Sequence, residues 1–200
     1  TIFSILPFYN SSIENSLKQN GKSQLCAGFF VYGPQTTFIL SLGKGVHSFY
    51  YDHTKNQFNI LNPNILIPES TSEFSINSSY RRYWNNKVNN YIKNCEDGTD
   101  GIREKNFNMR WVGSLVADAS RIFERGGIFL YPEDKREKNK SGRLRLTYEA
   151  NPISFLISQA GGKATNGSID ILNVVVDEIH QRVPFIFGSE EEVDIFLNTE

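Results

Sequence analysis

Two short segments of the sequence carry residue types that suit an anionic ligand. In residues 110–115 an arginine and a tryptophan precede a glycine, and Ser114 is placed to cap a helix over Leu115–Arg125. Backbone N–H groups and the dipole at a helix N-terminus favour a bound anion. In the second segment Arg143 and Arg145 would project from one face of a strand. Because guanidinium groups bind phosphate oxygens bidentately, both segments are candidates for a phosphate site.

Each candidate also has a plain structural interpretation. Residues 110–115 could form an ordinary capped helix, and the two arginines could be surface cations that pair with acidic neighbours. Glu149 follows the second segment, just before a predicted helix, in the crevice where α/β folds place ligands. Residues 77–80 offer hydrogen-bonding groups to a polyhydroxylated ligand, yet they could be a simple capping segment. The residue types alone leave these alternatives open.

Other possible sites fail on their spacing. Gly21-Lys22-Ser23 lacks the earlier glycine of a phosphate loop, because position 16 is a serine. The three histidines are widely separated, and Cys26 and Cys95 have no metal-ligand spacing, so we expect free thiols in a reducing cytoplasm. The loop over residues 133–141 mixes both signs of charge and has no interleaved aromatic residue, which predicts a solvated loop and no nucleic-acid contact.

The composition limits the class of protein. Two hundred residues, 39% of them hydrophobic, can build one sizeable core or two small lobes. A net charge of −1 provides no overall field for nucleic acid or an anionic membrane. No stretch approaches the roughly 20 apolar residues of a membrane-spanning helix. We therefore expect a cytoplasmic protein with no nucleic-acid or membrane partner.

The hydrophobic pattern changes along the chain. The first third predicts antiparallel strands over residues 1–5, 24–33, 36–42, 46–51 and 57–61. The second half alternates helices and strands, with helices over 80–94, 115–125 and 152–159, strands over 128–131, 143–148 and 183–187, and a C-terminal helix opened by a Ser189–Glu192 capping box. The fold class is therefore layered α/β, with mixed and antiparallel sheets and helices on their faces.

Several ordered blocks together resemble the class I fructose-1,6-bisphosphatase family, over nearly the whole chain. The blocks include Gly33-Pro34-Gln35-Thr36-Thr37, Val112-Gly113-Ser114-Leu115-Val116-Ala117-Asp118, residues 126–132, Leu144-Arg145-Leu146, Tyr148-Glu149-Ala150-Asn151-Pro152 and residues 159–165. The resemblance implies two domains, residues 1–67 as the remainder of a sheet domain and residues 68–200 as a substrate-binding domain.

The resemblance also implies a Mg²⁺-dependent enzyme of gluconeogenesis that hydrolyses fructose 1,6-bisphosphate to fructose 6-phosphate and phosphate. Arg110 would reach a neighbouring subunit's site in a homotetramer, and Glu149 would bind the metal. The implied substrate-binding residues are Asn77, Tyr80, Arg110, Trp111, Gly113, Ser114, Leu115, Phe129, Leu130, Tyr131, Arg143, Leu144 and Arg145. At two of these positions the chain departs from the family, with Trp111 where tyrosine is usual and Arg143 where lysine is usual.

The family's other metal ligands precede the segment that is seen here as residues 1–5. We therefore expect the chain to be the C-terminal part of a longer protein, with a partial substrate pocket and no catalytic turnover of its own. Two alternatives stay open: a sedoheptulose-1,7-bisphosphatase or dual sugar bisphosphatase, and a non-catalytic sugar-phosphate-binding module.

Overall fold

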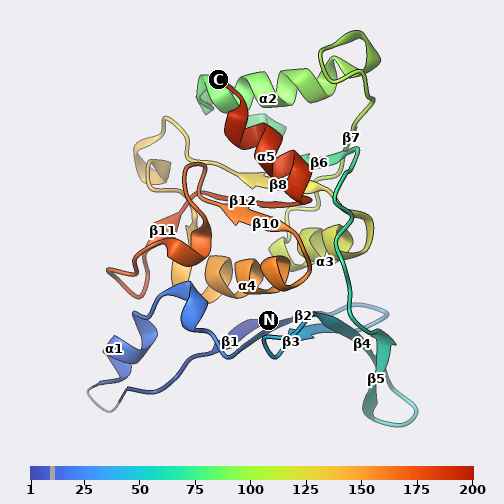
Figure 1. Cartoon of the computed structure of the whole chain (residues 1–200), viewed down its shortest axis with the longest axis vertical. Coiled ribbons are helices and arrows are strands. Elements are labelled where there is room, and N and C mark those ends of the chain that lie inside the picture. Colours follow the sequence, from blue (N-terminus) through green and yellow to red (C-terminus); the bar gives the residue numbers. More distant parts are fainter. Residues whose placement is uncertain (10–11) are drawn as a thin grey trace.

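The computed structural model of the chain describes residues 1–9 and 12–200, and its first sheet is antiparallel (Figure 1). The five strands pair in chain order: β1 (Ile2–Ile5), β2 (Cys26–Val31), β3 (Thr37–Ser41), β4 (His47–Asp52) and β5 (Gln57–Asn62). Tight turns join β3 to β4 and β4 to β5, as antiparallel neighbours allow. The predicted antiparallel arrangement of the first third is confirmed.

The second sheet is mixed and has the order β10-β12-β8-β6-β7. Its strands are β6 (Glu73–Ile76), β7 (Asn108–Met109), β8 (Ile128–Tyr131), β10 (Lys163–Thr165) and β12 (Phe185–Gly188). The β6 strand runs parallel to both of its neighbours, β7 and β8, whereas β12 runs antiparallel to both of its neighbours, β8 and β10. The carboxyl ends of β6 and β8 therefore lie at the same edge.

Helices fill the space between the sheets and cover the outer face of the mixed sheet. Figure 1 shows α3 (Leu115–Arg125) and α4 (Asn151–Gln159) between the two sheets, and α2 (Asn86–Glu96) and α5 (Glu190–Asn198) beyond the mixed sheet. A short α1 (Ile13–Leu17) lies near the N-terminus. None of the helices in residues 1–9 and 12–200 is long and apolar enough to cross a membrane. The layered α/β class is confirmed.

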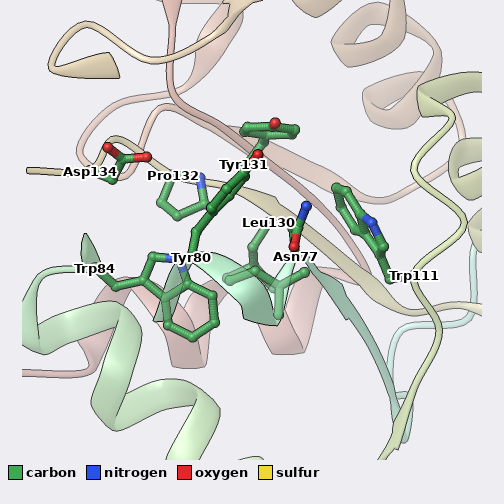
Figure 2. Close-up of a pocket in the computed structure, with 9 residues that line it drawn as sticks. Asn77, Tyr80, Trp84, Trp111, Leu130, Tyr131, Pro132 and Asp134 are labelled. Atoms are coloured by element: carbon green, nitrogen blue, oxygen red, sulfur yellow. The ribbon is translucent and has the colours of Figure 1, made fainter. Parts of the chain in front are cut away.

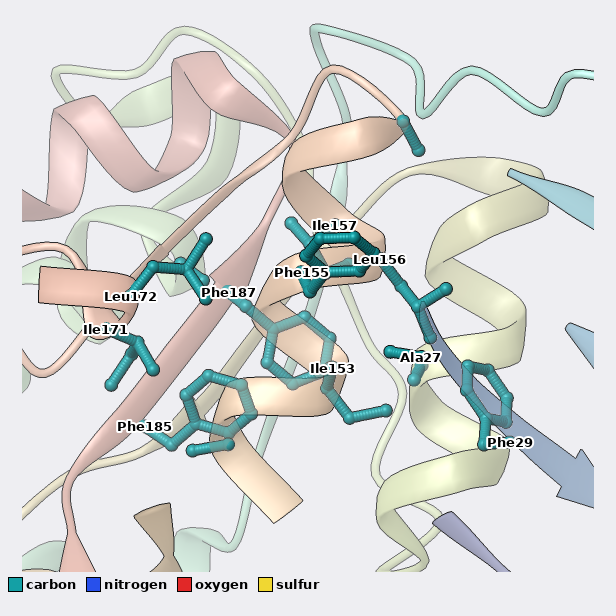
Figure 3. Packing of buried hydrophobic residues seen from close by; sticks show 14 of the residues in the cluster. Ala27, Phe29, Ile153, Phe155, Leu156, Ile157, Ile171, Leu172, Phe185 and Phe187 are labelled. Atoms are coloured by element: carbon teal, nitrogen blue, oxygen red, sulfur yellow. The ribbon is translucent and has the colours of Figure 1, made fainter. Parts of the chain in front are cut away.

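Two hydrophobic clusters hold these layers together. The larger cluster joins Ala27 and Phe29 of β2 to residues of α4 and β12, such as Leu156 and Phe187 (Figure 3). It also includes Phe123 of α3. A second cluster lies between the mixed sheet, α2 and α5. Because the larger cluster draws on both halves of the chain, the two predicted domains share one core. The predicted boundary at residue 67 stays a prediction.

The predicted helix over residues 80–94 is wrong in its first part. Residues Ser78–Tyr83 form a 3-10 helix, η2, and Trp84 is extended. The α-helix begins after Asn85, whose side chain accepts a hydrogen bond from Val88 N–H at 3.0 Å. This cap starts a new helix, because a side-chain oxygen satisfies an N–H group that has no helical partner. The apolar residues keep a helical spacing across Asn85, although the helix itself is interrupted there.

The predicted strand over residues 143–148 is also wrong beyond its start. Only β9 (Leu144–Arg145) is extended, and it pairs with β11 (Arg182–Val183). Residues Leu146–Ala150 form a π-helix, η5, which runs directly into α4. Glu149 is therefore a helical residue. Such π-helical turns are rare and occur frequently at functional sites.

The capping box predicted at Ser189 and Glu192 does not form. The Ser189 hydroxyl donates to Pro68 O at 2.6 Å and accepts from Gly127 N–H at 3.1 Å. The buried Glu192 carboxylate pairs with Arg103 and accepts from the Tyr91 hydroxyl. Long-range partners therefore take both side chains away from the local role, although Ser189 still precedes α5.

Candidate functional site

A pocket lies where two parallel strands end. Asn77 directly follows β6, and Tyr131 is the last residue of β8. Ligands of open α/β sheets bind outside the carboxyl ends of their strands. Figure 2 shows the Tyr80 and Tyr131 rings near each other, with Trp111 to one side and Asp134 to the other. The lining residues are Ile76, Asn77, Tyr80, Trp84, Trp111, Leu130, Tyr131, Pro132 and Asp134.

Stacked aromatic rings form one wall of this pocket. The Trp111 ring stacks on Phe129, with 5.6 Å between centroids and 17° between planes, and it lies 5.9 Å from the Tyr131 ring. Phe129 is only 2% exposed and stacks in turn on Phe187 in the core. Phe129 therefore supports Trp111 from the side of the core, whereas the side chain of Leu130 lines the pocket itself.

Cationic side chains surround the two tyrosines. The Arg143 guanidinium lies 5.4 Å from the centre of the Tyr131 ring. Hydrogen bonding to Arg143 first, and to Arg136 next, lowers the pKa of Tyr80. Burial raises the pKa of Tyr131, and the charge of Arg143 opposes that effect. The Tyr80 hydroxyl therefore lies in a region where positive charge outweighs negative charge, which suits an anion.

The loop over residues 110–114 is held by a buried carboxylate. Asp118, in the first turn of α3, is 0% exposed, and its Oδ2 accepts from the Gly113 N–H at 3.2 Å. Its Oδ1 accepts from Arg121 Nη1 at 3.1 Å and lies 2.8 Å from the Ser75 hydroxyl. Ser75 and Arg121 also donate to the carbonyl of Arg110. The loop is thus fixed from both ends against β6 and α3.

Gly113 is the residue that this loop requires. Its φ of +82° lies in the left-handed region, which is strained for residues with a Cβ. Its N–H is already donated to Asp118, so only its other atoms remain for a ligand. The N–H groups of Leu115 and Val116 precede the first helical hydrogen bond, which joins Asp118 N–H to the Ser114 carbonyl. They are the donors that a ligand at this helix end would meet.

A second hollow adjoins the other end of the same loop. It is lined by Thr1, Ile2, Ser114, Leu115, Val116, Tyr148 and Glu149. The Glu149 Oε2 accepts a hydrogen bond from the Arg145 N–H at 2.6 Å, so the carboxylate folds back over the start of η5. The loop from Trp111 to Ser114 connects this hollow to the pocket at the strand ends.

The predicted site residues therefore divide between two linked hollows. Asn77, Tyr80, Trp111, Leu130 and Tyr131 line the first, and Ser114, Leu115 and Glu149 line the second.

The remaining predicted residues border these hollows or lie outside both. Arg143 borders the first hollow, because its guanidinium contacts the ring of Tyr131, whereas Leu144 packs against the larger core cluster. The Arg145 Nε is buried without a hydrogen-bond partner among the described residues, which leaves a donor for an added acceptor. Arg110 is 49% exposed, with its Nε 3.6 Å from Glu73.

Comparisons with known proteins match this chain along almost its whole length. The family described as "Fructose-1-6-bisphosphatase, N-terminal domain" matches residues 1–63, and "Fructose-1-6-bisphosphatase, C-terminal domain" matches residues 67–199. The chain is 51% identical, over 196 residues, to "Fructose-1,6-bisphosphatase class 1" of Azorhizobium caulinodans, covering 96% of this chain and 60% of that relative. The chain belongs to the class 1 fructose-1,6-bisphosphatase family. It spans 60% of the length of the curated relative that it matches.

Fructose-1,6-bisphosphatases are metal-dependent phosphatases, and the carboxylates of this chain are its candidate metal ligands. Mg²⁺ prefers octahedral oxygen ligands, often with several carboxylates. Among residues 1–9 and 12–200, no group of three or more His, Cys, Asp or Glu side chains gathers in one place. Glu149 presents one carboxylate to the second hollow. The described residues therefore do not make a complete metal site by themselves.

Several residues of the site escaped the sequence analysis. The loop 133–141, predicted to be solvated, contains the buried pair Asp134 and Arg136, and Asn139 is only 2% exposed. Trp84 lines the pocket although its spacing assigned it to a helix face. For Asp134 and Arg136, the Asp-x-Arg spacing after a strand end was a usable signal, because Asp side chains favour local turns. The role of Asp118 had no signal beyond its place in the first turn of a helix.

Proposed function

We propose that this chain is the sugar-phosphate-binding part of a fructose-1,6-bisphosphatase of gluconeogenesis, which hydrolyses fructose 1,6-bisphosphate to fructose 6-phosphate and phosphate in the cytoplasm. The observation that carries the proposal is the convergence of Asn77, Tyr80, Tyr131 and Arg143 at the ends of β6 and β8. Hydroxyl, amide and guanidinium groups on an aromatic wall suit a phosphorylated sugar, because each phosphate oxygen and hydroxyl needs a partner.

The two linked hollows suggest how the substrate would lie. The 6-phosphate would occupy the pocket beside Tyr80, Tyr131 and Arg143, with the sugar along the loop that carries Gly113. The 1-phosphate would then face the second hollow, where Arg145 would bind it and Glu149 would contribute one ligand to Mg²⁺. The unpaired Nε of Arg145 supports this role, because a bound phosphate oxygen would supply its missing acceptor.

Hydrolysis of a phosphate monoester has a very high uncatalysed barrier, and metal ions lower it by neutralising charge and activating water. One carboxylate does not supply that chemistry. We therefore propose that the 200-residue chain binds the product sugar phosphate without turning over the bisphosphate, and that the further carboxylates belong to the part of the family's length that this chain does not span. Arg110 would extend into a neighbouring subunit of a homotetramer, which its half-exposed side chain permits.

The test combines binding and turnover. Both tryptophans of the chain line the pocket, so intrinsic fluorescence reports on its occupancy. We expect fructose 6-phosphate to change this fluorescence with saturation, and fructose to have no effect at the same concentration. We expect no phosphate release from fructose 1,6-bisphosphate with Mg²⁺. Release at ordinary enzyme rates would refute the predicted inactivity, and an unchanged fluorescence would refute the binding site.

Two alternatives are distinguished by related measurements. A sedoheptulose-1,7-bisphosphatase would favour the seven-carbon sugar, so titration with sedoheptulose 7-phosphate beside fructose 6-phosphate compares the two reaction products directly. A non-catalytic module would bind the sugar phosphate tightly, and a chain that spans the full length of the family would still show no turnover. The fructose form is favoured by the segment Gly113-Ser114-Leu115-Val116-Ala117, which is part of a block that resembles the fructose-1,6-bisphosphatase family.

A further inference from the structure

The loop after β8 carries an arginine–aspartate pair, with a buried carboxylate, that lies outside the predicted site residues. The Arg136 Nε donates to Asp134 Oδ1 at 2.9 Å, and its Nη2 donates to Oδ2. Asn139 Nδ2 also donates to Asp134 Oδ2 at 2.8 Å, and the Arg136 N–H donates to Oδ1. The side chains of Arg136 and Asp134 are 19% and 5% exposed. The carboxylate is thus saturated with donors, and it fixes the guanidinium in one orientation.

This orientation places Arg136 against Tyr80, which lines the pocket. Its guanidinium carbon lies 4.0 Å from the centre of the Tyr80 ring and 4.8 Å from that of Tyr83. Nε and Nη2 occupy one edge of the planar group, so Nη1 points away from Asp134. The Arg143 guanidinium lies 5.4 Å from the centre of the neighbouring Tyr131 ring, so both arginines contact tyrosines that line the pocket, and together they lower the pKa of Tyr80.

We propose that Arg136 is a phosphate-binding residue of the pocket, a second guanidinium beside Arg143, and that Asp134 positions it. The ligand class is a phosphate monoester, bound between the two arginines and the Tyr80 hydroxyl. This proposal rests on the proposed function and names a further residue of that same site. A second fixed guanidinium strengthens the binding of a phosphate dianion, because the Nη1 group of Arg136 adds charged donors to those of Arg143.

A purely structural role for Arg136 makes a different prediction. If the Asp134–Arg136 pair only braces the loop against η2, its loss would disturb every ligand of the pocket in proportion to the lost stability. If Arg136 binds phosphate, its loss would weaken ligands that carry a phosphate and would also reduce the dependence of their binding on salt, since screening acts on the charge. Asn139→Ala removes a brace of the same loop without removing a cation, so it separates the two roles.

The experiment titrates the 200-residue chain with inorganic phosphate and with fructose 6-phosphate, followed by calorimetry and tryptophan fluorescence. The variants are Arg136→Gln and Arg136→Lys. Asn139→Ala is the control for the loop, and Arg81→Gln, whose arginine pairs with Glu96 outside the pocket, is the control for charge. We expect Arg136→Gln to weaken the binding of both ligands roughly tenfold, as the loss of a charged hydrogen-bonding partner predicts. We expect Arg136→Lys to recover part of that loss, Asn139→Ala to weaken binding clearly less than Arg136→Gln does, and Arg81→Gln to bind as the parent chain does.

Each outcome decides one of the two proposals. If the parent chain binds phosphate but not the sugar phosphate, the proposed function is wrong, and the Arg136 proposal is still judged by the phosphate titration. Equal losses in Arg136→Gln and Asn139→Ala would overturn the phosphate-binding role. Unchanged binding by Arg136→Gln would overturn it as well, and a parent chain that binds neither ligand would overturn both proposals.

Discussion

The carboxylate of Asp118 accepts a hydrogen bond from the backbone N–H of Gly113, with 3.2 Å between Oδ2 and the nitrogen. The same carboxylate receives Arg121, and Arg121 also holds the carbonyl of Arg110. One fully buried acidic group therefore sets the path of the loop that separates the two hollows. It does so from the following helix, without lining either hollow itself.

Replacing this carboxylate should loosen the loop. In Asp118→Asn, one carboxylate oxygen becomes an NH₂ group. A hydrogen-bond donor would then face an N–H donor that needs an acceptor. We expect the free energy of unfolding to fall by about 1–3 kcal/mol, the usual result of leaving a buried polar group unsatisfied. We also expect fructose 6-phosphate binding to weaken roughly tenfold, because the loop loses its fixed geometry. Urea unfolding and a fluorescence titration measure the two effects.

A matched control is Glu192→Gln. Glu192 is 1% exposed and also pairs with an arginine, but it lies between α2 and α5, away from both hollows. We expect this variant to lose comparable stability and to bind the sugar phosphate normally. Equal losses of affinity in the two variants would show that affinity follows stability alone, contrary to a specific role for Asp118.

The conformation of Gly113 gives a second prediction. A Cβ at its φ of +82° is strained, and the nearest atom it would meet is the Trp111 Nε1 at 3.4 Å. We expect Gly113→Ala to cost about 1–2 kcal/mol of stability and to weaken the binding of fructose 6-phosphate. Gly161→Ala is the control, because Gly161 has a φ of +80° with no atom within 4 Å of an added Cβ, and it lies at the end of α4. It should lose similar stability without losing affinity.

The elements that the sequence predicted well are those whose signals are local. The strand Ile128–Tyr131 lies between a glycine pair and a proline, and helix Leu115–Arg125 ends at Gly126, where φ is +72°. Residues 143–148 misled because arginine and leucine alternate there with a period of two. In the structure Leu146, Thr147 and Ala150 are buried, which is the spacing of one helical face. A short alternation of apolar and polar residues does not distinguish a strand from one face of a helix.

The parts of the site that could not be predicted depend on distant partners. The capping box at Glu192 failed because Tyr91 and Arg103, about 90 to 100 residues away in the chain, claim its carboxylate. Asp134 and Arg136 are neighbours in sequence, yet their burial depends on η2, whose Tyr80 and Tyr83 rings cover the guanidinium. Polar residues in a loop are usually solvated, so composition alone gave the wrong environment.

Trp111 offers a test of the difference from the family. The sequence resemblance implies a tyrosine at this position, and a tyrosine hydroxyl can both donate and accept, whereas an indole has one N–H donor. We expect Trp111→Tyr to bind fructose 6-phosphate several-fold more tightly than Trp111→Phe, which has no polar group. Calorimetry is the appropriate measurement, because the fluorescent residue itself is changed. Equal affinities for the two variants would show that this ring contributes only its stacking on Phe129.

The Asp134–Arg136 pair also predicts a dependence of stability on pH. Hydrogen bonds, from Arg136 above all, lower the pKa of Asp134 from its ordinary 3.8 to about 2. Because the folded-state pKa is the lower one, this contribution is present above about pH 4 and is lost as the pH falls toward 2; it amounts to about 2 kcal/mol. We expect Asp134→Asn to lower the free energy of unfolding at neutral pH. Between neutral pH and pH 2, the variant should lose less of this free energy than the parent chain does, by the same amount. Urea unfolding at several pH values measures both effects. Glu14→Gln, which breaks an exposed pair with Lys18, should leave the pH dependence nearly unchanged, and an equal effect from it would contradict the role of the buried pair.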